Sequence, residues 1–136
     1  MFHDVYSGRL KLNGEEHKST IRAANNYASS LISLERLEEA KALLRKTVPV
    51  ARRVLGKCDD LTLGMRMLYA KTLCEDAGAT LADLREAVTT LEETERTARQ
   101  VLGGAHPLTT GIANSLQIAR AILGARESGI EVKINR

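Results

Sequence analysis

Three histidines and two cysteines are the side chains of this chain best suited to hold a metal ion. Zinc sites place such ligands at short, regular spacings, as in CxxC or HxxxH motifs. His3, His17 and His106 lie far apart, and Cys58 and Cys74 belong to no such motif. The sequence therefore predicts no metal site. Because it also shows no export signal, we expect both thiols to be reduced and the protein to be cytoplasmic.

Adjacent carboxylates could act as a general acid and a general base. Acid pairs of this chain include Glu38 with Glu39, Asp59 with Asp60, and Glu92 with Glu93. All three fall on predicted helix faces or helix starts, where solvent or the helix dipole stabilises their charge without any catalytic role. Gly103 and Gly104 are not followed by the Lys-Ser/Thr of a phosphate-binding loop. We therefore predict no catalytic residue, no cofactor and no enzymatic activity.

Charge is spread evenly along the 136 residues. Lys and Arg number 20 and Asp and Glu 17, which gives a net charge of +3, and acids and bases alternate rather than cluster. Aromatic residues make up 3% of the chain, and there is no Trp. A nucleic-acid groove needs clustered cations and stacking aromatics, so the composition argues against a nucleic-acid partner. No apolar stretch is long enough to span a membrane, and the length suits one domain.

The segment 54–62 has further copies in the chain. It returns as 101–109, 47 residues later, and a fainter copy around Gly14 precedes Gly56 by 42 residues. Self-similarity at such a period is the signature of a repeat protein. We assign the difference between the two spacings to a five-residue insertion at Ala77–Thr80, where a turn can absorb it at small entropic cost.

The spacing of apolar residues predicts two helices in each repeat unit, because these residues recur every three or four positions in two successive stretches. Gly56 and Gly103 suit helix exits, Pro107 suits a first turn, and Thr80 with Asp83 fits a capping box. We therefore predict an all-α fold, a right-handed superhelical array of antiparallel helix pairs (an α-α solenoid). Its expected parts are the end of a preceding repeat or an N-terminal extension at 1–14, a first helix pair at 15–56, a second pair with the turn insertion at 57–103, a lone helix at 104–126 and a tail at 127–136.

The repeated residues resemble a known family, the tetratricopeptide repeat in its 42-residue, kinesin light chain-like form. The resemblance covers about 14–125 and rests on the first-helix sequence Ala24–Ala28, the second-helix opening Leu37–Ala40, the helix end Ala51–Gly56 and the loop Gly103–Pro107. Three residues depart from the family pattern. Glu35 replaces the glycine of the turn between the helices, so that turn should adopt another geometry or strain slightly. Lys18 stands where the third unit has Pro107, and Pro49 should kink its helix near 45–49.

This resemblance implies a non-catalytic scaffold for protein–protein interaction, in which the first helices of the units line a concave groove for a peptide or protein segment. Carried over residue by residue, the groove consists of Arg22, Asn25, Asn26, Ser29, Met67, Lys71, Asn114, Ser115 and Ile118. Asparagine suits this task because its amide both donates to and accepts from a peptide backbone. A packing or solvent-facing role is the alternative at each position.

The last unit has no second helix, so the apolar row of its lone helix should lie uncovered. That row consists of Ile112, Leu116, Ala119, Ile122 and Leu123. A row of that size calls for a cover, and we predict a homodimer or a firmly bound larger partner at this face. The strand-like segment Ile130–Arg136 is the alternative cover. The alternative function is therefore a structural subunit that associates through its exposed repeat ends with itself or with a larger assembly.

Overall fold

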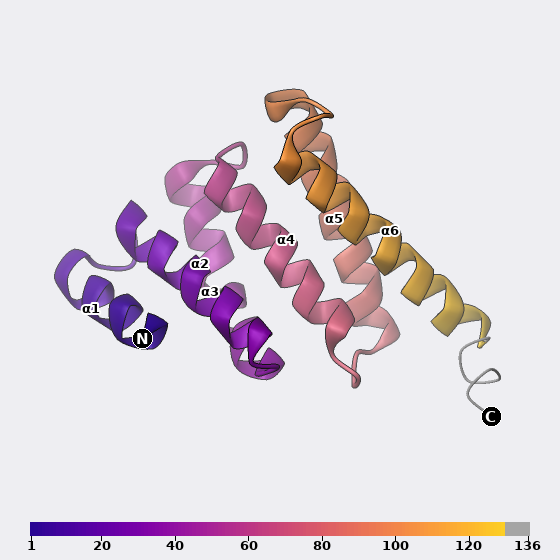
Figure 1. The fold of residues 1–136 in the computed structure, drawn as a ribbon, viewed down its shortest axis with the longest axis horizontal. Coiled ribbons are helices and arrows are strands. Elements are labelled where there is room, and N and C mark those ends of the chain that lie inside the picture. The colour runs from indigo at the N-terminus through magenta and orange to yellow at the C-terminus, as the bar shows by residue number, and fades with distance from the viewer. Residues whose placement is uncertain (130–136) are drawn as a thin grey trace.

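The computed structural model describes residues 1–129, and within them the chain is helical with no strand. Its helices are α1 (Phe2–Asn13), α2 (Lys18–Ser33), α3 (Leu37–Leu55), α4 (Asp60–Glu75), α5 (Leu81–Leu102) and α6 (Pro107–Ser128). Each helix packs against the next one in the sequence, as Figure 1 shows. The predicted all-α solenoid is therefore confirmed. The strand-like segment predicted at 130–136 lies outside the described residues.

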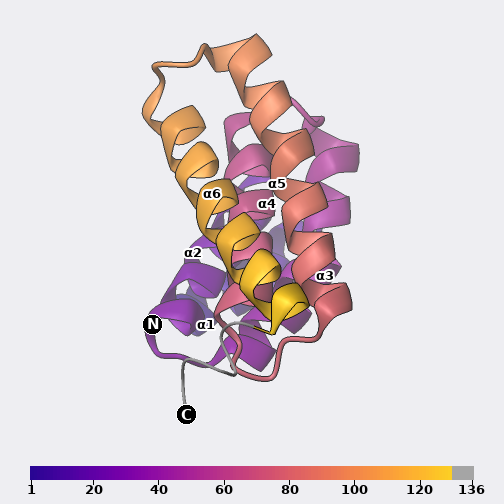
Figure 2. The same ribbon diagram turned by 90° about the vertical axis from the view of Figure 1, so that its right-hand side faces the viewer.

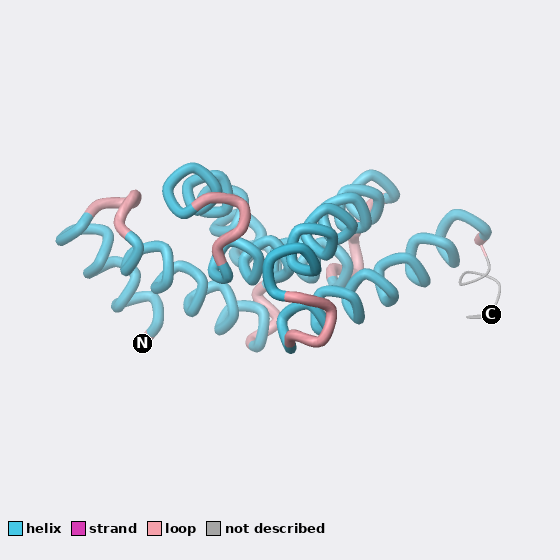
Figure 3. The backbone as a smooth tube through the Cα atoms, turned by 90° about the horizontal axis from the view of Figure 1, so that it is seen from above, coloured by secondary structure: helices cyan, strands magenta, loops and turns pink. Residues whose placement is uncertain are grey.

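The helices form two layers. Helix α4 contacts both α2 and α6, so these three helices lie side by side in one layer. Helices α3 and α5 lie in the second layer (Figure 2). Seen from above, the helices form a row with α1 at one end and α6 towards the other (Figure 3). Among the described helices, only α2 packs against α1. One end of the row is thus a single short helix attached through one face.

A glycine ends the helix that precedes each of α2, α4 and α6. These glycines are Gly14, Gly56 and Gly103, with φ of 80°, 87° and 88°. Their ψ values, between 156° and 170°, complete a backbone conformation that side chains with a Cβ scarcely adopt. Each glycine N–H donates to the carbonyl four residues earlier, which closes the last helical turn. The predicted glycine exits are confirmed.

Three residues after each glycine, a side chain caps the next helix. The Nδ1 atoms of His17 and His106 accept hydrogen bonds from the backbone N–H two residues later, at 3.1 and 3.0 Å. In the loop before α4, Asp59 Oδ1 accepts from the N–H two residues later in the same way, at 2.8 Å. A helix start leaves backbone donors without intrahelical partners, and these caps satisfy one of them. The two histidines therefore have a structural role, at equivalent positions of the first and third loops.

A buried threonine three residues beyond each cap ties one helix pair to the helix before it. Thr20 Oγ1 donates to the carbonyl of Arg9 in α1 at 3.2 Å, and Thr62 Oγ1 donates to the carbonyl of Ala51 in α3 at 3.3 Å. Thr109 holds the third equivalent position and is fully buried. Within the described part of the chain its Oγ1 has no hydrogen-bond partner.

Small residues let the helices of each pair lie close together. Ala28 and Ala40 in α2 and α3, and Ala70 and Ala87 in α4 and α5, are all 0% exposed. Leu44 is equally buried and fills the neighbouring space. Because interiors are close-packed, methyl groups at these positions set how near the backbones can approach.

The turn between α2 and α3 places Glu35 in the left-handed region, with φ of 60°. The Glu35 N–H donates to the Ile32 carbonyl at 3.0 Å and the Arg36 N–H to the Leu31 carbonyl at 2.8 Å. These two bonds are the Schellman motif, whose left-handed residue is usually glycine. Glu35 therefore adopts the glycine's conformation, and the strain predicted for this turn is present.

The start of α5 and the middle of α3 carry the other two local signals. Thr80 Oγ1 accepts from the Asp83 N–H at 3.1 Å and Asp83 Oδ2 accepts from the Thr80 N–H at 3.0 Å, which confirms the capping box. The bond from the Thr80 N–H holds the pKa of the Asp83 carboxyl below its usual value. Helix α3 continues through the exposed Pro49 from Leu37 to Leu55, and a kink there stays a prediction.

The exit glycines generate a prediction about stability. We expect Gly56→Ala to lower the free energy of unfolding by about 1 to 3 kcal/mol, because alanine is strained at this φ and ψ. The matched control is Gly64→Ala inside α4, where an added Cβ meets nothing within 4 Å. That change should raise stability by about 0.5 to 1 kcal/mol. Urea titrations measure both, and losses of equal size would contradict a special role for the exit glycine.

Glu35 generates the opposite prediction. Glu35→Gly should raise the free energy of unfolding by roughly 0.5 to 1 kcal/mol, because glycine relieves the left-handed strain but gains freedom in the unfolded chain. Glu38→Gly, at an exposed position in the first turn of α3, should lower it by about 1 kcal/mol. Thermal melts of the two variants should therefore shift in opposite directions. A lower melting temperature for Glu35→Gly would show that the side chain itself stabilises the turn.

Candidate protein-binding groove

The largest group of side chains predicted to bind a partner lines a hollow between α4 and α6. This hollow has a volume of about 160 Å³. Its lining consists of Lys71, Cys74 and Glu75 from α4, Leu91 from α5, and Asn114, Ser115, Ile118 and Ile122 from α6. Four of the nine predicted groove residues, Lys71, Asn114, Ser115 and Ile118, are thus brought together from two helices.

The hollow combines an apolar surface with a polar edge. Ile118 is 60% exposed, while Leu91 is 1% exposed. Asn114 is exposed and Ser115 half-buried. Lys71 Nζ lies 3.8 Å from Glu75 Oε1, so the rim carries one balanced ion pair. Such a surface suits an apolar side chain flanked by hydrogen-bonding groups.

Arg22 lies in a different hollow, at the starts of α2 and α4. It shares this space of about 540 Å³ with Lys18, Asp59, Asp60 and Leu61. Lys18 Nζ is 3.8 Å from Asp59 Oδ2. This hollow is larger and more polar than the one between α4 and α6, and its charged lining suits polar or charged groups.

Asn26 and Ser29 lie in a third hollow, between α1 and α2, together with Phe2, Ser30 and Ser33. Asn25 is half-buried, and its Oδ1 is buried without a hydrogen-bond partner in the described chain. Met67 is also half-buried and packs against the core. The nine predicted residues are therefore divided among separate hollows and core positions, and only the set between α4 and α6 gathers from two neighbouring helices.

The row predicted to lie uncovered on α6 needs correction. Ile112, Leu116 and Ala119 are 0%, 3% and 0% exposed, because α6 packs these residues inward against α5 and α4. Ile122 and Leu123 are half-buried. Three of the five residues are therefore unavailable to a second copy or a partner. The premise of the predicted dimer through this row is wrong.

Three exposed positions of α6 are polar where α4 has buried apolar residues. The repeat aligns Thr110, Gln117 and Arg120 with Leu63, Ala70 and Leu73 of α4, which are buried. In α6 the three aligned residues are all exposed. The sequence carried this signal, as a change of residue type at equivalent positions.

Two partly buried polar contacts are not evident from the sequence. The Arg66 side chain is 7% exposed, and its Nη2 donates to Glu93 Oε2 at 2.9 Å. Tyr69 Oη accepts from Arg45 Nε at 3.0 Å and donates to Glu86 Oε2 at 2.7 Å. Burial and the bond to Glu86 raise the pKa of the Tyr69 hydroxyl. Both contacts join helices within the core region, so they are structural.

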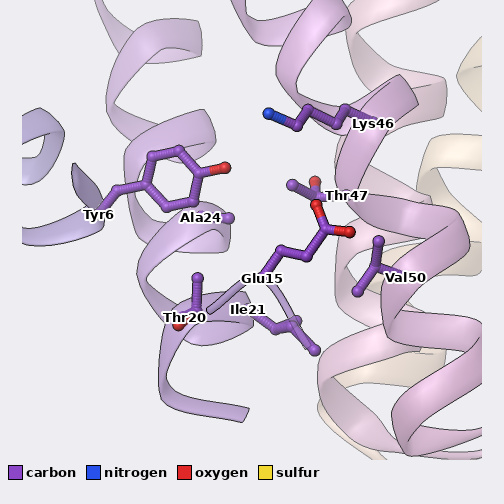
Figure 4. Close-up of a pocket in the computed structure, with 8 residues that line it drawn as sticks. All are labelled: Tyr6, Glu15, Thr20, Ile21, Ala24, Lys46, Thr47 and Val50. Carbon is purple, nitrogen blue, oxygen red and sulfur yellow. The ribbon is translucent and has the colours of Figure 1, made fainter. Parts of the chain in front are cut away.

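In the first helix pair, Ala24 holds the position equivalent to Arg66. A small cavity lies beside Ala24 and is also lined by Tyr6, Glu15, Lys46 and others (Figure 4). Its volume is about 10 Å³, which holds about one water molecule. Burial, with Glu15 nearby, raises the pKa of the Tyr6 hydroxyl. The cavity is too small for a ligand.

Metal and membrane sites were sought over residues 1–129. No group of three or more His, Cys, Asp or Glu side chains there could hold a metal ion. None of the described helices combines the length and apolar character needed to cross a bilayer.

Comparison with known families gives one match. Residues 20–60, which run from α2 through α3 to the first residue of α4, match the sequence model of the tetratricopeptide repeat. The match supports a tetratricopeptide repeat protein. A search of curated proteins found no match. Tetratricopeptide repeats generally mediate protein–protein interactions and are typically non-catalytic. The matched segment covers most of α2 and all of α3, and α2 lies beside α4.

The reactivity of the two thiols tests the predicted burial of Cys74, which lines the hollow between α4 and α6. Burial, with the neighbouring Glu75, raises the pKa of the Cys74 thiol to about 11. The thiolate is the reactive form, so Cys74 should react slowly with iodoacetamide at neutral pH and faster as the pH rises. Cys58 is exposed and should react first. Mass mapping over time measures both alkylation rates. In urea the two thiols should react at similar rates, whereas similar rates in the folded protein would contradict the burial of Cys74.

Proposed function

We propose that this chain is a non-catalytic scaffold module that binds a peptide or protein segment in the hollow between α4 and α6. The observation that carries the proposal is Ile118, a large apolar side chain left 60% exposed beside a hollow with an apolar floor. Exposed apolar surface rimmed by polar groups is typical of an interaction site. The general role of tetratricopeptide repeats in protein–protein interaction supports it.

The chemistry of the lining indicates how a ligand segment binds. A large apolar side chain packs against Ile118 and Ile122, and the Asn114 amide pairs with the ligand's backbone. One such pair contributes about 0.5 to 1.5 kcal/mol net, while burial of the apolar side chain contributes about 1.5 to 3 kcal/mol. Apolar contact therefore dominates the affinity. A longer segment continues along the first helices towards Asn26 and Arg22.

The repeat type, the bounds of the repeat units and the cellular location are further parts of this proposal. We assign the repeat to the kinesin light chain-like, 42-residue type on the spacing from Gly14 to Gly56 and the sequence Ala24–Ala28. The units run over 15–56 and 57–103, with α6 as the lone first helix of a third. A cytoplasmic location fits two free cysteines in a chain of this kind.

The proposal predicts a single decisive side chain. Peptides selected from a random phage-displayed library on the immobilised chain should bind it in solution by calorimetry. Ile118→Lys should weaken that binding by about tenfold or more, because it places a charge on the apolar contact. Val54→Lys, at a 39% exposed valine on α3, is the matched control and should bind as the wild type does.

Two outcomes would reject this site. One is equal binding by Ile118→Lys and the wild type with circular dichroism showing both folded. The other is equal weakening by Val54→Lys, which would indicate a nonspecific response to added charge. Asn26→Ala then reports how far the ligand extends, since a loss of affinity without loss of stability would place Asn26 in contact with the segment.

A further inference from the structure

Helix α1 carries an exposed apolar stripe that no described part of the chain covers. Met1, Val5 and Leu12 are 86%, 45% and 80% exposed. With Gly8, their spacing is four, three and four residues, which is the seam spacing of paired helices. The opposite face of α1 is occupied, since Tyr6 stacks on Tyr27 of α2 with ring centroids 6.0 Å apart. The stripe therefore points away from the rest of the solenoid.

Gly8 lies in the middle of this stripe without a role inside the chain. A Cβ built on it meets no atom within 4 Å, and its φ is not in the left-handed region. Glycine inside a helix destabilises it relative to alanine. One use that offsets this cost is close approach by another backbone, because a helix crossing at Gly8 meets no side chain there.

We propose that α1 is a twofold contact with a second copy of this chain, in which the two α1 helices pair antiparallel. In this register Met1 lies opposite the partner's Leu12, and Val5 lies opposite the partner's Gly8. The large Val5 side chain thus fills the space that glycine leaves open. Each of these two pairings forms twice by symmetry, which gives four layers, as a self-complementary contact requires.

Charge complementarity favours a second copy as the occupant. The residues that flank the stripe on one side are Asp4 and Lys11, both exposed. Antiparallel pairing sets Asp4 beside the partner's Lys11, so both flanking positions on that side carry opposite charges. On the other side Phe2, 38% exposed, lies beside the partner's Arg9, where a guanidinium can stack on the ring.

The contact is small, so the dimer should be weak. Each copy contributes one helix of 12 residues, about 18 Å long, and so less than the roughly 800 Å² per partner of a standard interface. Sedimentation of the full chain from micromolar to millimolar concentration should show a reversible shift from monomer to dimer. A monomer over the whole range overturns the proposal.

Substitutions locate the contact. Val5→Asp and Leu12→Asp should each raise the dimer dissociation constant about tenfold or more, and their exposure means that the monomer should still fold. Val101→Asp, at a 48% exposed valine on α5, is the matched control and should leave the constant unchanged. A dimer that persists in Val5→Asp but is lost in Gln117→Asp would place the contact on α6 and overturn the proposal.

A charge exchange tests the antiparallel register. Asp4→Lys alone and Lys11→Asp alone each place like charges opposite one another, so each variant should dimerise more weakly than the wild type. Mixing the two variants should restore dimerisation, because every Lys then faces an Asp of the other chain. Failure to restore it on mixing, with both variants folded by circular dichroism, would reject the antiparallel pairing.

Discussion

The loop that leads from one helix pair into the next is the constraint on which the array depends. Its glycine turns the backbone out of the finished helix, and a side chain three residues later caps the new helix. In the first two loops a threonine three residues beyond the cap also donates back to the finished helix. In the middle loop these are Gly56, Asp59 and Thr62, the last bonded to the Ala51 carbonyl. The direction and the separation of successive pairs are therefore set by local chemistry.

With the helix positions set by these loops, the exposed residues between them are free to differ. Equivalent positions on α2, α4 and α6 carry Ser29, Lys71 and Ile118. Only the last is a large apolar side chain, and it lies where α4 and α6 leave a hollow. Binding chemistry is thus concentrated at one junction of the array, while the same loops repeat at every junction. A change at Ile118 alters recognition without altering the scaffold.

How much could be predicted from the sequence follows from the range of each interaction. Glycine exits, the histidine caps and the Thr80–Asp83 capping box depend on residues within a turn of one another, and the structure contains them all. The burial of Leu116 depends on how α6 rotates against α5, which no local spacing reports. The Arg66–Glu93 pair escaped for the same reason, since its partners are 27 residues apart.

The two ends of the array differ in a way that bears on assembly. Helix α1 presents Met1, Val5 and Leu12 to solvent, whereas the exposed α6 residues Thr110, Gln117 and Arg120 are polar. A twofold contact through α1 uses the same patch on both copies, so it closes on itself and does not extend into open fibres. Helices α1 and α6 lie towards opposite ends of the row (Figure 1). Because the hollow is lined mainly by α4 and α6, each copy in such a dimer keeps its own hollow free. A partner with two binding segments would then gain from effective concentration rather than from new contacts.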